Sequence, residues 1–237
     1  MSFRRCLALL IAVVVLMPMG LRAQQTKPVF APVAPSESIK NLDALKEELK
    51  QYHECTSKCG CYAKDLDLQA NRAVAFLRER AARRAKQEKL AVVLDIDETT
   101  LSNYAEMLKE DFEFDGNVFD AWVKTAAAPA IPGTLRLYKE AQRLGVSVFF
   151  LTGRGEAERA ATEQNLRAQG FEGWQELIMR KAGQSPLAIV YKPTERAGIV
   201  AKGYTIVLNV GDQWSDLKGD QEAEYSVKYP DPYYFIK

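Results

Sequence analysis

Histidine is nearly absent from this chain, whose 237 residues include a single one. One histidine excludes catalysis by a histidine nucleophile beside a second catalytic histidine, and it excludes a histidine-rich dimetal site. Excess charge of either sign is also absent, since 32 basic residues stand against 31 acidic ones and the formal net charge is +1. Without a strong field, the composition argues against nucleic acid and an anionic membrane surface as partners.

The sequence also lacks an apolar run long enough for a membrane span. Its longest uncharged run, residues 6–21, is shorter than the roughly 20 residues that a spanning helix needs. The run follows Arg4 and Arg5 and precedes Ala23, which favours a cleaved signal segment over residues 1–23. We therefore expect an exported protein, periplasmic or secreted, with no stable membrane span after cleavage.

Residues 24–88 are expected to form a linker and then helices. Three prolines predict an extended linker over residues 24–38. Apolar residues three and four apart predict an N-terminal helical segment over residues 39–88, with two amphipathic helices that pack against the rest of the protein.

Between these helices lies a short segment with His53, Cys55, Cys59 and Cys61. In an oxidising compartment, two of the three cysteines are expected to form a disulfide and to leave one thiol over. The alternative is a second metal site for zinc or copper, although the spacing matches no standard pair of Cys-x-x-Cys units. Both interpretations stay open at this point.

Two acids follow the most apolar stretch outside the N-terminal run. Residues 90–94, Leu-Ala-Val-Val-Leu, predict a buried strand. Side chains alternate in extended chain, so Asp95 and Asp97 can face the same point while Ile96 packs away from it. Two adjacent carboxylates repel each other, and the pair therefore implies a metal, an acid/base role, or both.

A second polar cluster follows the next predicted strand, residues 146–151. Thr152, Gly153 and Arg154 place a hydroxyl, a flexible glycine and a guanidinium at the end of that strand. Together they can present hydrogen-bond donors to a phosphate group.

Two further clusters complete the set. Lys192 is expected just before a helix, where its charge would neutralise an anion. Asp212 and Asp216 follow a predicted strand over residues 205–210, and two carboxylates four residues apart suit a hard cation. We expect all of these clusters to converge at the carboxyl edge of one sheet.

The alternation of strands and helices from residue 90 onward predicts an α/β fold, a Rossmann-like parallel sheet with helices on both faces. The predicted body spans residues 89–237, with a small insertion at about 104–132 that lies over the carboxyl edge. Aromatic residues in this insertion predict either walls of a substrate pocket or ordinary core packing. The C-terminal YPDPYYFIK is expected to be a surface segment docked by its aromatic rings.

Four stretches, DIDETTLSN, LTGR, YKPTER and VGDQWSDL, resemble in order the four motifs of the haloacid dehalogenase (HAD) superfamily of phosphohydrolases. Within it, the chain is similar to exported acid phosphatases of the subfamily that includes plant vegetative storage proteins and bacterial class B and class C acid phosphatases. If the aromatic residues of the insertion stack a nucleobase, nucleoside monophosphates are a candidate substrate class. The resemblance implies an HAD-like fold and Mg²⁺-dependent hydrolysis of small phosphomonoesters. It also leaves open a storage or binding protein that has lost catalysis, an envelope metal-binding module, and phosphotransfer to an alcohol.

The resemblance also implies roles for the clustered residues. Asp95 would attack phosphorus and form an aspartyl-phosphate, and Asp97 would protonate the leaving alcohol and then activate water. Thr152, Gly153 and Lys192 would hold the nonbridging oxygens, with Arg154 as a further phosphate or substrate contact. The implied Mg²⁺ ligands are Asp95, the backbone carbonyl of Asp97, Asp212 and, directly or through water, Asp216.

Overall fold

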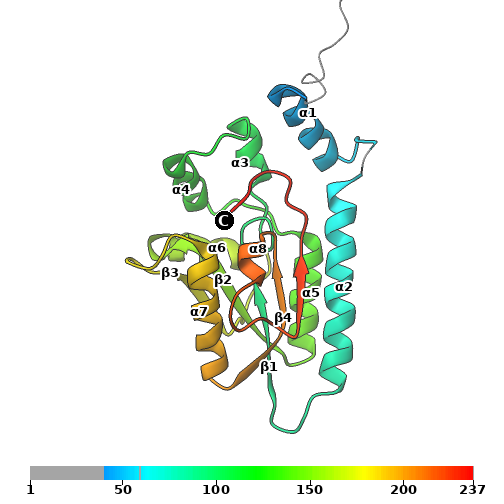
Figure 1. Ribbon diagram of the computed structural model, residues 1–237, viewed down its shortest axis with the longest axis vertical. Coiled ribbons are helices and arrows are strands. Elements are labelled where there is room, and N and C mark those ends of the chain that lie inside the picture. Colours follow the sequence, from blue (N-terminus) through cyan, green and yellow to red (C-terminus); the bar gives the residue numbers. More distant parts are fainter. Residues whose placement is uncertain (1–39, 59, 237) are drawn as a thin grey trace, which may run out of the picture. The chain divides into compact units, whose positions relative to one another are not determined.

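Five parallel strands form one sheet within residues 40–58 and 60–236, which are the residues that this computed structural model describes. The strands are β1 Lys89–Leu94, β2 Ser147–Gly155, β3 Glu176–Arg180, β4 Tyr204–Gly211 and β5 Tyr225–Lys228. Their order across the sheet is β3-β2-β1-β4-β5. Because β1 lies at the centre, between β2 and β4, the segments that leave these three strands meet at one edge (Figure 1).

Helices cover both faces of this sheet. In chain order, the helices of the described residues are α1 Leu42–His53, α2 Tyr62–Ala82, α3 Tyr104–Lys109, α4 Gly116–Lys124, α5 Pro132–Arg143, the 3-10 turn η2 Glu156–Glu158, α6 Arg159–Ala168, α7 Ala188–Ala201 and α8 Trp214–Leu217. Residues of α2, α5 and α6 join the core on one face, and residues of α7 join the core on the other. The predicted parallel α/β architecture is therefore confirmed. Among the described helices, none is long and apolar enough to cross a membrane.

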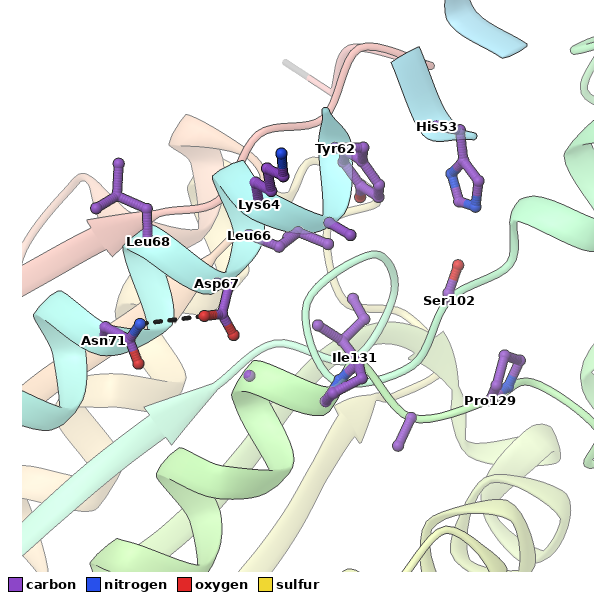
Figure 2. Close-up of a pocket in the computed structure, with 14 residues that line it drawn as sticks. His53, Tyr62, Lys64, Leu66, Asp67, Leu68, Asn71, Ser102, Pro129 and Ile131 are labelled. Atoms are coloured by element: carbon purple, nitrogen blue, oxygen red, sulfur yellow. Dashed lines mark hydrogen bonds between the residues drawn. The ribbon is translucent and has the colours of Figure 1, made fainter. Parts of the chain in front are cut away.

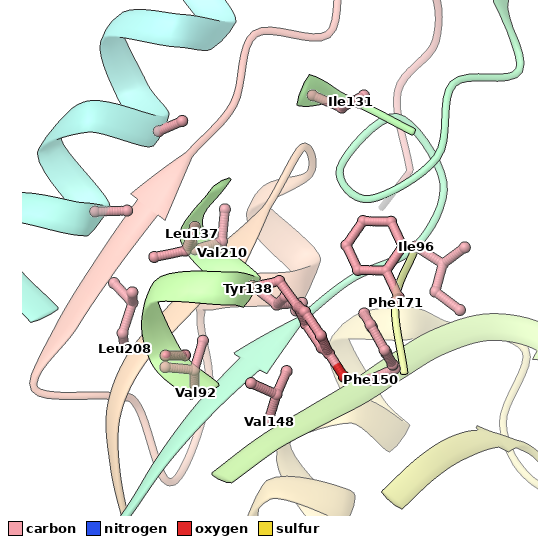
Figure 3. Packing of buried hydrophobic residues seen from close by; sticks show 14 of the residues in the cluster. Val92, Ile96, Ile131, Leu137, Tyr138, Val148, Phe150, Phe171, Leu208 and Val210 are labelled. Carbon is pink, nitrogen blue, oxygen red and sulfur yellow. The ribbon is translucent and has the colours of Figure 1, made fainter. Parts of the chain in front are cut away.

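The central strand is buried on both faces, as a parallel strand between two helical layers must be. Val92 and Leu94 belong to the larger hydrophobic cluster, in which Tyr138 of α5 stacks on Phe150 of β2 (Figure 3). The alternate residues of β1 pack on the opposite face with residues of α7 such as Ile199. This double burial fixes the position at which the chain leaves β1.

The insertion after β1 contains α3 and α4 and lies beyond the carboxyl ends of the strands (Figure 1). Its two ends are joined by backbone hydrogen bonds, because Ser102 N donates to Pro129 O at 2.9 Å and Ile131 N donates to Thr100 O at 3.0 Å. The insertion thus leaves and re-enters the body at one place.

Several expectations need correction or fall outside the described residues. The first half of α1 does not pack as predicted, because Leu42 and Leu45 are 65% and 42% exposed, whereas Tyr52 near its end packs against the core. Strand β5, just before the C-terminal segment, was not predicted. It has only four residues and two of them are exposed, so it lacks the buried apolar run that predicts the other strands. The predicted signal segment, the linker over residues 24–38 and Cys59 lie outside the described residues.

A glycine sets the close approach of α2 and α5. A Cβ at Gly133 would lie 2.6 Å from the Cβ of Ala70, so Gly133→Ala forces the two helices apart. We expect it to lower the free energy of unfolding by about 1–3 kcal/mol, as overpacking does. Gly198→Ala in α7 is the matched control, since nothing lies within 4 Å of its added methyl group, and it should be neutral or stabilising. Urea denaturation measures both, and equal effects of the two variants would contradict the packing argument.

Candidate active site

Three aspartates meet beyond the carboxyl ends of β1 and β4. Asp95 directly follows β1, and its N–H donates to Val210 O at 3.0 Å, so pairing with β4 continues as far as this acid. Asp212 directly follows β4, and Asp216 lies in α8. Carboxylate oxygens of the three residues lie within 4.8 Å of one another. The structure therefore brings three of the four predicted metal-binding residues to one buried point.

Gly211 makes the position of Asp216 possible. A Cβ at residue 211 would lie 2.5 Å from the Cβ of Asp216, so only glycine fits between the end of β4 and this acid. The Gln213 N–H then donates to Asp216 Oδ2 at 2.9 Å and holds the carboxylate in place.

Lys192 lies among the same acids. Its Nζ donates to Asp95 Oδ1 at 2.6 Å and to Asp216 Oδ1 at 2.5 Å, and the side chain is 4% exposed. The prediction that it precedes a helix at a strand end is wrong, because it is the fifth residue of α7, with Pro193 also inside the helix. Burial opposes its charge, but Asp216 and Asp95 outweigh burial and raise the pKa of Lys192 well above its ordinary value.

The charges of this cluster do not balance. Three carboxylates and one ammonium carry a formal charge of −2 when all are ionised, and all four groups are buried. Burial raises the pKa of Asp95 despite Lys192, and burial together with Asp216 and Asp95 raises the pKa of Asp212. An all-oxygen donor set with an excess charge of −2 fits a hard divalent cation.

Asp97 lies in different surroundings from the other three acids. Arg154 donates to Asp97 Oδ1 through Nη2 at 2.7 Å and through Nε at 3.1 Å. Burial opposes ionisation of Asp97, but the guanidinium outweighs it, so the pKa of Asp97 is held below its ordinary value. The Asp97 carboxylate is not part of the three-acid group. Arg154 is 4% exposed and faces an acid, and its predicted contact with phosphate stays a prediction.

The two other predicted phosphate ligands lie at the end of β2. The strand runs on through Gly155, farther than predicted, and its pairing with β3 shifts register between Leu151 and Gly155. Thr152 is buried and its Oγ1 accepts from Arg154 N at 3.1 Å, whereas Gly153 is exposed. Residues 152–154 thus form an irregular strand end, at which Arg180 Nε donates to Gly153 O at 3.3 Å.

Several residues that hold the acids were not predicted. Thr99 Oγ1 donates to Asp212 Oδ1 at 3.0 Å, and Gln213 Nε2 donates to Asp212 Oδ2 at 2.8 Å. Arg196 of α7 is fully buried and donates through Nη1 to Asp216 O at 2.7 Å. Thr99, Gln213 and Arg196 lie inside the quoted motifs, but no spacing rule distinguishes them from ordinary polar residues.

The cysteine segment forms a disulfide between Cys55 and Cys61. Bonded sulfurs cannot act as thiolate ligands, so this arrangement favours the disulfide alternative over a second metal site. His53 Nδ1 lies 2.6 Å from Tyr233 Oη, and its ring stacks on Tyr104. The histidine thus joins an aromatic cluster that links α1 to the insertion and the C-terminal segment, as the predicted docking of that segment by its rings requires.

A groove of about 690 Å³ lies beside this cluster (Figure 2). It runs between the first turns of α2 and the segment that leads into α5, and His53, Tyr62, Ser102 and Ile131 are among the residues that line it. None of the acids of the three-acid group lines the groove, and neither does Lys192. The groove and the charged cluster are therefore separate features.

Comparison with known proteins gives the family. A family model described as "HAD superfamily, subfamily IIIB (Acid phosphatase)" matches residues 22–237. The chain belongs to this subfamily. The class C acid phosphatase from Bacillus anthracis has the same fold, with a TM-score of 0.66 and 23% identity over 82% of this chain and 87% of that one.

The relatives differ in what their names state. "Acid phosphatase 1" of Solanum lycopersicum is 43% identical over 61% of this chain and 58% of that protein. "Stem 31 kDa glycoprotein" of Glycine max is 39% identical over 61% and 59%, and "Vegetative storage protein 2" of Arabidopsis thaliana is 34% identical over 61% and 56%. The matched region is thus less than two thirds of each of these relatives.

His53 provides a pH test of the aromatic cluster. Burial lowers the pKa of His53 to about 4, from an ordinary value of 6.5. The folded protein then binds fewer protons than the unfolded chain, so stability from His53 is complete above about pH 6.5 and is lost as pH falls through about 4. NMR titration measures this pKa directly, because the chain has one histidine.

The variant His53→Phe tests the predicted effect of pH on stability, because it keeps an aromatic ring against Tyr104 but cannot take up a proton. The difference in Tm between the parent protein and the variant should shrink as pH falls from 7 to 4.5. A titration midpoint at or above 6.5 would contradict the burial of the imidazole.

Proposed function

We propose that the chain is a Mg²⁺-dependent acid phosphatase that hydrolyses phosphomonoesters through an aspartyl-phosphate on Asp95. The observation that carries the proposal is the convergence of Asp95, Asp212 and Asp216 around Lys192 Nζ. Such a cluster offers a nucleophile, a cation for a phosphoryl oxygen and ligands for a divalent ion in one place. Family membership supports the same reaction class.

In the first step, a carboxylate oxygen of Asp95 attacks phosphorus and the ester oxygen leaves. Asp97 donates a proton to this oxygen, so that an alcohol departs and Asp95 holds the phosphoryl group. In the second step, Asp97 takes a proton from water, which attacks the aspartyl-phosphate, releases inorganic phosphate and restores Asp95.

Arg154 acts in this scheme on Asp97. It keeps the acid ionised in the free protein, which is the form that activates water. The negative charge of an approaching phosphomonoester raises the proton affinity of Asp97 and favours the form that donates to the leaving group. Thr152, the backbone of Gly153 and Lys192 are proposed to hold the nonbridging oxygens.

Mg²⁺ is proposed to bind to Asp95, Asp212 and Asp216 and to the backbone carbonyl of Asp97. The oxygen donors and the excess charge of −2 support this assignment. When bound, the ion offsets repulsion between the carboxylate of Asp95 and the phosphate dianion. The residues themselves supply the rest: Thr99 and Gln213 orient Asp212, and Lys192 holds Asp95 and Asp216.

Export to the periplasm or outside the cell is part of the proposal, and the Cys55–Cys61 disulfide supports it because disulfides persist in oxidising compartments. The proposed substrates are small phosphomonoesters. Nucleoside monophosphates are the candidate class, because the aromatic rings of the insertion offer surfaces on which a base can stack.

Asp95→Asn tests the nucleophile. The amide is isosteric but cannot form the acyl phosphate, so release of phosphate from p-nitrophenyl phosphate with saturating Mg²⁺ should fall by about 10³-fold or more. Asp43→Asn, at an exposed position of α1, is the control and should retain full activity. Undiminished turnover in Asp95→Asn refutes the nucleophile, and a parent protein that is inactive on a panel of phosphomonoesters favours the storage or binding alternative.

Asp212→Asn tests the metal site without an activity assay. In the parent protein, MgCl₂ should raise the Tm, since a ligand at 100 times its Kd stabilises by about 2.7 kcal/mol. The variant should lose this shift and should have a higher Tm in the absence of metal, because one of three mutually repelling buried charges is gone. An unchanged Mg²⁺ shift in the variant would exclude Asp212 as a ligand, and Asp43→Asn again serves as the control.

A further inference from the structure

We propose that Trp122, in the insertion, is a positioning residue for the acid/base Asp97 and acts on it through the side-chain amide of Asn103. The proposal rests on the proposed function, because it assigns Trp122 to the proton-transfer step of that reaction. It separates Trp122 from the phenylalanines of the insertion, whose side chains carry no hydrogen-bond donor.

The geometry that carries the proposal is a chain of two hydrogen bonds. Trp122 Nε1 donates to Asn103 Oδ1 at 2.8 Å, and Asn103 Nδ2 donates to Asp97 Oδ1 at 2.9 Å. Asn103 is 1% exposed, and Trp122 is partly buried against the main hydrophobic core. The indole is thus one residue away from the acid, and neither bond is open to exchange with bulk water at Asn103.

The amide of Asn103 is held in one orientation from both ends. Its Nδ2 group also donates to Glu98 Oε2 at 2.9 Å, so both hydrogens of the amide face carboxylates. A flipped amide would direct its oxygen at these two acids and its hydrogens at the indole N–H, which is unfavourable at both ends. The Trp122 N–H therefore acts together with the Asp97 carboxylate to favour the orientation in which Asn103 Nδ2 donates to Asp97 Oδ1.

The hydrogen bond between Trp122 and Asn103 connects the insertion to the loop that carries Asp95 and Asp97. Asn103 directly follows the hydrogen-bonded turn of the Asp95 loop, whereas Trp122 lies in α4, which packs near η2 and α6. Arg154 holds Asp97 from the side of β2, and Asn103 holds it from the side of the insertion. Asp97 thus has one anchor in the sheet and one whose position depends on the insertion.

The experiment uses Trp122→Phe, which keeps an aromatic ring and removes the N–H donor. The readout is kcat/KM for two substrates, p-nitrophenyl phosphate and an alkyl phosphate such as O-phosphoserine. A nitrophenolate leaves without a proton, but an alkoxide needs one from Asp97. We expect kcat/KM to fall about 10-fold for the alkyl phosphate and less than about twofold for p-nitrophenyl phosphate. The 10-fold loss is a part of the rate enhancement of about 10²–10⁴ that a positioned acid supplies.

Two further variants make the result decisive. Trp174→Phe is the matched control, because Trp174 packs edge to face on Phe150 in the core, and it should change neither substrate's kcat/KM. Asn103→Ala should show the same leaving-group selectivity as Trp122→Phe, and the double variant should lose no more than Asn103→Ala alone, since the two residues act in series.

Two outcomes overturn the inference. If Trp122→Phe lowers kcat/KM equally for both substrates, or leaves both unchanged, the indole N–H does not position the acid. Asp97→Asn distinguishes a failure of this inference from a failure of the proposed function. This variant should lose more kcat/KM on the alkyl phosphate than on p-nitrophenyl phosphate. If its loss does not depend on the leaving group while the parent protein is active, Asp97 is not the acid and the inference fails as well.

Discussion

The buried contact of Lys192 with Asp95 and Asp216 is the interaction on which the rest of the site depends. Three carboxylates at the ends of β1 and β4 repel one another, and removal from water makes that repulsion larger. Helix α7 supplies two cations that offset this repulsion. Lys192 donates to the carboxylates, and Arg196 donates to the backbone carbonyl of Asp216 in α8. The helix therefore fixes the acidic loop at two points, and its packing against the sheet places both side chains.

The two acids of the DIDET sequence are two residues apart and have opposite surroundings. Asp95 is buried among other carboxylates, and its pKa is raised, whereas Asp97 is paired with Arg154 and its pKa is lowered. In the proposed function, a divalent ion held by these acids would lower the pKa of Asp95 and keep its carboxylate ionised. Strand β1 ends at Leu94 and the chain bends at Ile96, so the two acids have different partners, although alternation in extended chain would place them on one side.

Much of this arrangement could be predicted from the sequence, and the exceptions have physical causes. Buried apolar runs followed at once by acids located Asp95 and Asp212, because both the strand and the residue after it are local features. Lys192 was expected before a helix, whereas α7 begins at Ala188 and continues through Pro193; a four-residue apolar run such as 188–191 does not distinguish a strand from the first turn of a helix. The Asp97–Arg154 pair joins residues 57 positions apart, which no local pattern reports.

The hydrogen bonds that join residues 100 and 102 to residues 131 and 129 make the insertion a closed loop whose two stems are adjacent. Because entry and exit coincide, a change of length or sequence between the stems displaces neither β1 nor α5. The strands that position the acids are therefore structurally independent of the length of the insertion, and the hydrogen bond from Trp122 to Asn103 is a point at which the two parts depend on each other.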